Sequence, residues 1–105
     1  MRSAILGRDV RAIREALGLP VLQFATVLGV HPSSVHRWES SGDQPVPIEG
    51  VAWTVLSALR QRVIAGNKGE RVRAAEAGQK VSNELATGGV LLALALLLVF
   101  AAGKE

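Results

Sequence analysis

The feature that most constrains this chain is a run of eighteen residues, 86–103, without a single charged side chain. Thr87 carries its only hydroxyl group. An amphipathic helix would show polar residues every three or four positions, so a helix over this run is apolar on all sides. At about 1.5 Å per residue it would be about 27 Å long, close to the thickness of a bilayer's hydrocarbon core. The run therefore predicts either a transmembrane helix or a helix buried in an oligomer.

The residues that flank this run favour the membrane. Four basic residues precede the run: Lys68, Arg71, Arg73 and Lys80. Only Lys104 and Glu105 follow it. By the positive-inside rule, we expect a C-terminal span that anchors a cytoplasmic domain to the inner membrane of a bacterium. Gly89 and Ala93 lie four residues apart, a spacing that lets two such helices pack closely, although it is a weak signal.

The first 64 residues show the periodicity of short helices separated by glycine and proline. Apolar residues at helical spacing predict helices over residues 8–17, 20–28, 32–40 and 48–64. Gly18 and Gly29 follow two of them as helix stops, and residues 41–47 form a loop. No alternating strand pattern occurs anywhere. We therefore expect an all-α protein with a small domain of the five-helix type over residues 1–64.

The segment 65–85 differs from both of its neighbours. It has four lysines or arginines against three glutamates, few large apolar residues, and glycines at positions 66, 69 and 78. We expect a basic linker that is partly helical between its glycines and that joins the domain to the hydrophobic helix of residues 86–103.

Composition argues against several kinds of chemistry. The chain has no cysteine, and its two histidines, His31 and His36, have no carboxylate cluster beside them, so we expect no metal site and no cofactor. No nucleophile stands at motif spacing from a base, and no phosphate-binding loop follows a strand, so we expect no enzyme. The net charge is +3, and nine of the twelve basic residues are arginine, which suits contacts with phosphates and base edges.

Residues 20–40 fit two short helices that cross steeply through a tight turn. Ala25 stands where the crossing leaves no room for a larger side chain, and Gly29 stands where the turn needs a positive φ. Val35 and Trp38, three residues apart, supply the buried side of the second helix. The residues between them then face outward.

From about Asp9 to Arg62 the chain resembles the Cro and phage-repressor-type helix-turn-helix family, often called XRE-like. The segments that carry the resemblance are "IREALGL", "FATVLGV" and "SSVHRWE", followed by Pro45 and an apolar helix. The family uses its second motif helix to contact the major groove of double-stranded DNA. The resemblance therefore implies a DNA-binding protein.

The resemblance also assigns roles to individual residues. It implies base contacts for Pro32, Ser33, His36 and Arg37, and contacts close to the DNA backbone for Ser34 and Ser40. It further implies an ion pair between Arg14 and Glu39 that ties the first helix to the end of the recognition helix. The chain departs from the family at Pro20 and Val21, where a hydroxyl residue and a DNA-contacting glutamine usually stand.

Three hypotheses for function follow. The first is a membrane-tethered transcriptional regulator that binds DNA as a homodimer, because one module contacts too few base pairs for high specificity. The second is a membrane-anchored adaptor that uses the same fold for protein contacts. The third is a soluble repressor or antitoxin-like protein in which the C-terminal helix forms an oligomerisation core.

Overall fold

The computed structural model describes residues 4–64, 66 and 68–102 of the chain. Six helices follow one another: α1 (Gly7–Leu17), α2 (Val21–Leu28), α3 (Pro32–Ser40), α4 (Gly50–Val63), α5 (Lys68–Ala86) and α6 (Val90–Ala102). No strand forms among these residues, and one isolated bridge joins Leu6 to Pro45. The prediction of an all-α fold is confirmed, but the described part of residues 1–64 holds four helices, and a fifth comes from the expected linker.

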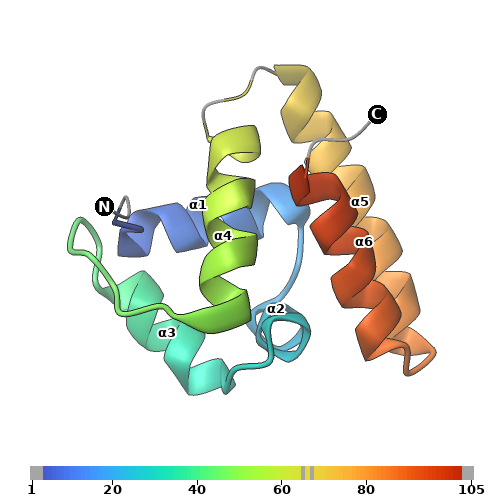
Figure 1. Ribbon diagram of the computed structural model, residues 1–105, viewed down its shortest axis with the longest axis horizontal. Coiled ribbons are helices and arrows are strands. Elements are labelled where there is room, and N and C mark those ends of the chain that lie inside the picture. The colour runs from blue at the N-terminus through green and yellow to red at the C-terminus, as the bar shows by residue number, and fades with distance from the viewer. Residues whose placement is uncertain (1–3, 65, 67, 103–105) are drawn as a thin grey trace.

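The helices form two groups that lie against each other. In Figure 1, α1 crosses behind α4, α2 and α3 lie below them, and α5 and α6 stand side by side as an antiparallel hairpin at one end. The hairpin packs on α1 through α5 and on α2 and α4 through α6. The two C-terminal helices thus pack against the helices that precede them.

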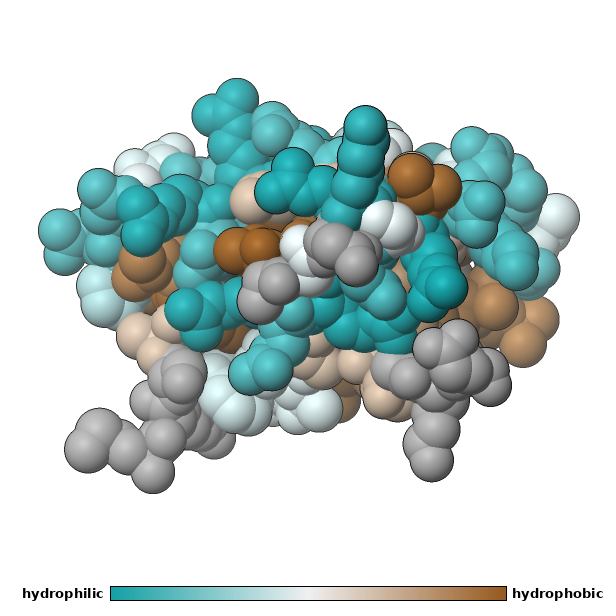
Figure 2. Space-filling view, turned by 90° about the horizontal axis from the view of Figure 1, so that it is seen from above, coloured by the Kyte–Doolittle hydropathy of each residue, from teal (hydrophilic) through white to brown (hydrophobic). Residues whose placement is uncertain are grey.

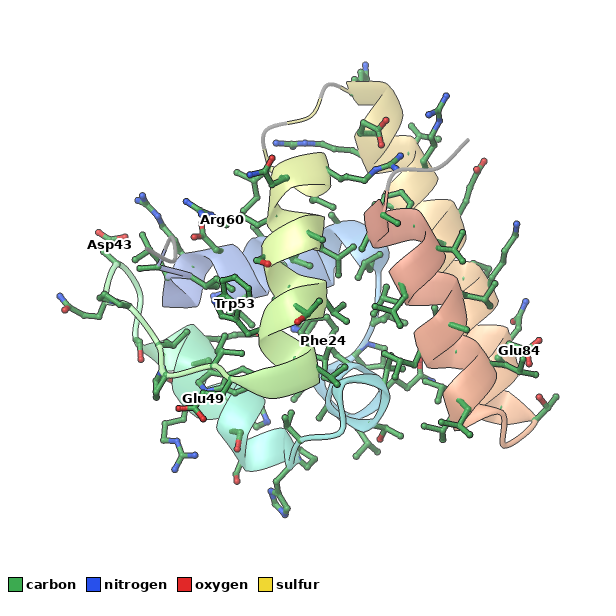
Figure 3. The ribbon with its side chains drawn as sticks, in the orientation of Figure 1. Phe24, Asp43, Glu49, Trp53, Arg60 and Glu84 are labelled. Carbon is green, nitrogen blue, oxygen red and sulfur yellow. The ribbon has the colours of Figure 1, made fainter. Side chains whose placement is uncertain are left out.

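The core of the first four helices is built around Phe24, which is fully buried. It lies between α2 and α4 in Figure 3. The other large buried side chains come from all of the first four helices and from the segments that join them: Val10, Ile13, Leu17, Leu19, Val27, Val35, Val55, Leu56 and Leu59. Their spacing of three and four residues is the periodicity that predicted the helices.

Asp9 is the third residue of α1, which begins at Gly7 with Leu6 at the cap. Its carboxylate accepts a hydrogen bond from the backbone N–H of Leu6 at 3.1 Å. The same carboxylate pairs with the Nε of Arg60 on α4, also at 3.1 Å. A short acidic side chain in the first turn therefore both caps α1 and holds α4 against it.

The segment expected to be a linker forms a nineteen-residue helix, α5. Gly78, which the sequence suggested as a helix breaker, lies buried in the middle of α5. A Cβ at this position would overlap the carbonyl oxygen of Leu17 at the end of α1. The glycine therefore permits close packing of two backbones, and the contact that explains it lies about sixty residues away in the sequence.

The prediction of a transmembrane helix over residues 86–103 is wrong for the part of the chain that the structure describes. The apolar run does not form one helix, because α5 ends at Ala86 and Gly88 takes a positive φ of 86°. The Gly89 N–H closes this turn by donating to the carbonyl of Glu84 at 2.8 Å. The helix that follows, α6, has thirteen residues, and no described helix is long and apolar enough to cross a membrane.

One face of α6 is covered within the chain itself. Ala93, Leu97 and Ala101, four residues apart, are buried against the other helices. The Arg62 guanidinium lies 4.5 Å from the centre of the Phe100 ring and also pairs with Glu70 of α5 at 2.6 Å. Contacts with α2, α4 and α5 thus cover one face of this apolar helix.

Replacing Gly78 by alanine tests whether α5 is a packed helix. We expect Gly78→Ala to lower the free energy of unfolding by about 1–3 kcal/mol in urea titrations, because the new methyl group meets the backbone of α1. Gly69→Ala, an exposed glycine in the first turn of the same helix, is the control and should be neutral or slightly stabilising. Equal effects of the two substitutions would contradict the packing of α5 on α1.

Candidate nucleic-acid interface

The turn between α2 and α3 sets the angle at which α3 leaves the core. Gly29 follows α2 with a φ of 75°, a conformation that side chains disfavour even though the space around its Cα is open. The Val30 N–H then donates to the carbonyl of Ala25 at 3.0 Å, which closes the end of α2. Ala25 is fully buried. The two positions that the sequence marked as requirements of the motif therefore occupy the turn and the helix crossing.

Two buried side chains fix which face of α3 points outward. Val35 is fully buried and Trp38 is 7% exposed, so this side of the helix belongs to the core. The residues for which DNA contacts were predicted lie between and beside these positions: Ser33, His36, Arg37 and Ser40 are exposed, and Pro32 and Ser34 are half-buried. The structure thus gathers all six predicted residues on one helix and places four of them at the surface.

The N-terminus of α3 is capped by a histidine. Nδ1 of His31 accepts a hydrogen bond from the Ser33 N–H at 3.1 Å and lies 2.8 Å from the Ser33 hydroxyl. Pro32 takes the first helical position, where its missing N–H costs nothing. His31 therefore acts as the cap of α3, and it orients the Ser33 hydroxyl at the start of the helix.

The other polar side chains of α3 differ in how they are held. The Ser40 hydroxyl donates to the His36 carbonyl at 2.8 Å, so its proton is used within the helix. The Arg37 Nη2 lies 3.4 Å from the Ser34 hydroxyl, a long contact at the exposed surface. Arg37 is also the only lysine or arginine of α3. It is therefore the group on this helix that is best suited to bidentate contact with a phosphate or a guanine edge.

Arg14 and Glu39 lie together, as the resemblance implied, and form a bidentate pair. Nε of Arg14 donates to one Glu39 carboxylate oxygen at 2.6 Å and Nη2 donates to the other at 3.1 Å. The third guanidinium nitrogen, Nη1, donates to the carbonyl of Leu19 at 3.0 Å. The two side chains are only 17% and 13% exposed. This pair ties α1, the start of α2 and the end of α3 into one unit.

The hydrogen bond with Glu39 raises the pKa of Arg14 above its ordinary value, against the opposing effect of burial. A raised pKa in the folded state adds stability that is complete below the ordinary pKa and is lost only as the pH rises through the folded one. Since both values lie far above neutrality, Arg14 contributes as a cation at every pH where DNA binding would be measured.

The start of α2 carries the departures from the family pattern. Pro20 is the N-cap of α2, has a φ of −68° and offers no side-chain hydrogen bond to the helix. Val21, the first residue of α2, is half-buried and packs against the core. This end of α2 therefore presents apolar side chains at the two positions where the family pattern usually has polar residues.

The comparison with family models matches residues 10–47 to a family described as Helix-turn-helix. The match begins within α1 and ends in the loop after α3, so it contains α2, the turn at Gly29 and all of α3. The comparisons with curated proteins and with solved structures give no match.

Removing the charge of Glu39 tests the pair that holds α3. We expect Glu39→Gln to lower the free energy of unfolding by about 2 kcal/mol, because it leaves Arg14 half-buried without its counter-ion. Glu15→Gln is the control, since Glu15 pairs with Arg11 at the exposed surface of α1. It should cost no more than about 0.5 kcal/mol in the same urea titrations. A loss as large in the control would show that the Arg14–Glu39 pair has no special role.

Proposed function

Residues 10–47 belong to the Cro/C1-type helix-turn-helix family of DNA-binding transcription regulators, and from this premise we propose that α3 lies in the major groove of double-stranded DNA. The observation that carries the proposal is the division of α3 into two faces. Val35 and Trp38 fix one face in the core, while Arg37 and His36 project from the other. The chain is then a sequence-specific transcriptional regulator.

The roles of the six residues follow from their positions on α3. Arg37 contacts a base edge, and Ser33 and His36 contact bases or phosphates beside it. Ser34 and Pro32 are half-buried beside the core, so they shape the surface of α3 that approaches the DNA backbone. Ser40, at the end of α3, contacts the DNA backbone through the lone pairs of its hydroxyl oxygen.

The sparse set of contacts on α3 supports binding as a homodimer. α3 carries one arginine, and Val21 stands where the family usually has a DNA-contacting glutamine. A single copy therefore makes few polar contacts with DNA. Two copies on two half-sites add their contacts and so raise both affinity and specificity.

Replacing Arg37 by alanine in the full chain tests its role as a base contact. The native protein is first used to select a preferred DNA sequence from a pool of random duplexes. Arg37→Ala should then weaken binding to that sequence by about 10- to 100-fold and relax the preference at one base pair per half-site. Arg71→Ala is the matched control, because it removes an exposed arginine from α5. An unchanged sequence preference in Arg37→Ala would contradict the assignment of Arg37 as a base contact.

Salt dependence separates DNA binding from an adaptor function of the same fold. A regulator that neutralises phosphates releases counter-ions, so its affinity for random duplex DNA should fall steeply as salt rises. Fluorescence anisotropy with a labelled duplex measures this directly. A chain that does not bind duplex DNA even at low salt would instead use α3 for protein contacts.

A further inference from the structure

The outer face of α6 is an exposed apolar surface that the DNA-binding proposal does not use. We define this outer face by six residues: Leu91, Leu92, Ala95, Leu98, Val99 and Ala102. Leu91 is 82% exposed, Leu92 is 61% exposed and Val99 is 60% exposed. No charged residue occurs anywhere in α6. Several large aliphatic side chains of α6 therefore face outward, away from the inner face of Ala93, Leu97 and Ala101.

Figure 2 shows the molecule from above. Hydrophilic residues cover most of this view, and hydrophobic residues are visible in several places, among them the end where Figure 1 places α5 and α6. The exposed fractions on the outer face correspond to roughly 500 Å² of apolar surface, near the upper end for the largest patch on a monomer. Two such faces together would bury roughly 1,000 Å², about the minimum for a specific protein interface. The area therefore suits a pair of copies.

The spacing on the outer face is that of a helix–helix seam. Leu91, Ala95, Leu98 and Ala102 follow one another at intervals of four, three and four residues. Leu92 and Val99 repeat the seven-residue interval beside them. A 3.5-residue repeat is the pattern with which two helices interlock side by side, and alanine at every second seam position lets the helix axes approach closely. Of the pair Gly89 and Ala93, which the sequence suggested for such packing, Ala93 is buried within the chain and Gly89 is half-buried.

The charges beside the outer face complement one another under a two-fold axis. Glu84 of α5 lines the groove next to Leu92 and Ala95, near the start of α6, and in Figure 3 it projects outward from the hairpin. Arg73 and Lys80, with Glu76 between them, line the groove next to Val99, nearer the end of α6. If two α6 helices pair antiparallel, Glu84 of each copy approaches the basic end of the other. A second copy therefore matches this surface in shape, polarity and charge.

We propose that two copies of the chain pair antiparallel through the outer face of α6, with Ala95 near the two-fold axis. This inference deepens the proposed function, because it names the surface that makes the regulator a dimer. The pairing itself depends only on α6 and on the neighbouring charges of α5. It can therefore be tested without DNA.

The test is sedimentation equilibrium of the full chain and of matched variants in the absence of DNA. Ala95→Glu puts two carboxylates opposite each other near the axis, and Leu91→Glu places one at the most exposed seam position. Both should raise the dissociation constant of the dimer by about 100-fold or more, because each new carboxylate would face the apolar surface of the partner. In Ala95→Glu the two carboxylates would also repel each other. Val72→Glu is the control, since Val72 is 56% exposed on α5 and lies outside the outer face of α6.

The expected result is a native dimer, a Val72→Glu dimer, and monomers for Ala95→Glu and Leu91→Glu whose circular dichroism matches that of the native chain. A native chain that stays monomeric at high concentration would overturn the proposal, as would dimers of both α6 variants. So would a monomeric native chain that floats with phosphatidylserine vesicles, since a lipid surface would then cover α6. Failure of DNA binding leaves the sedimentation result unchanged, so the two proposals fail separately.

Discussion

The rest of the structure depends on the close approach of two backbones where Gly78 of α5 meets Leu17 at the end of α1. Apart from Gly78, only Ala74 and Val81 of α5 are buried, so large side chains do not hold this helix in place. Its packing relies on the absence of a Cβ at the crossing, which lets many small contacts form at short range. Once α5 is fixed, the turn at Gly88 returns the chain along it, and α6 covers part of α2 and α4.

The same helix that receives α5 also positions the candidate recognition helix. Arg14 and Leu17 stand on successive turns of α1, one bonded to Glu39 at the end of α3 and the other in contact with α5. Asp9, near the start of α1, pairs with Arg60 of α4. α1 is thus the common support of the C-terminal hairpin and of α3, so the outer face of α6 and the exposed face of α3 are held in one rigid frame.

The sequence predicted the first three helices well, because their ends are determined locally. Gly18 and Gly29 take the positive φ that stops a helix, and Val35 and Trp38 mark a buried face by spacing alone. The prediction from sequence failed where a contact with residues far away in the chain determines the local structure. Gly78 resembles a helix breaker in the sequence, and only its distant contact with Leu17 explains why it lies inside α5. The pair of Arg14 with Glu39, by contrast, could be anticipated only from the family resemblance.

The apolar character of α6 misled the sequence interpretation for a further reason, which bears on how the chain works. A helix that is apolar all round predicts burial on all sides, and the fold satisfies that requirement on the inner face alone. Leucines on the outer face would be replaced by polar residues at little cost to this fold, so their presence points to a second surface that covers them. A single copy presents one arginine on α3 and so gains much from a partner. The proposed pair of copies would therefore account for two features together, the single arginine of α3 and the exposed apolar face of α6.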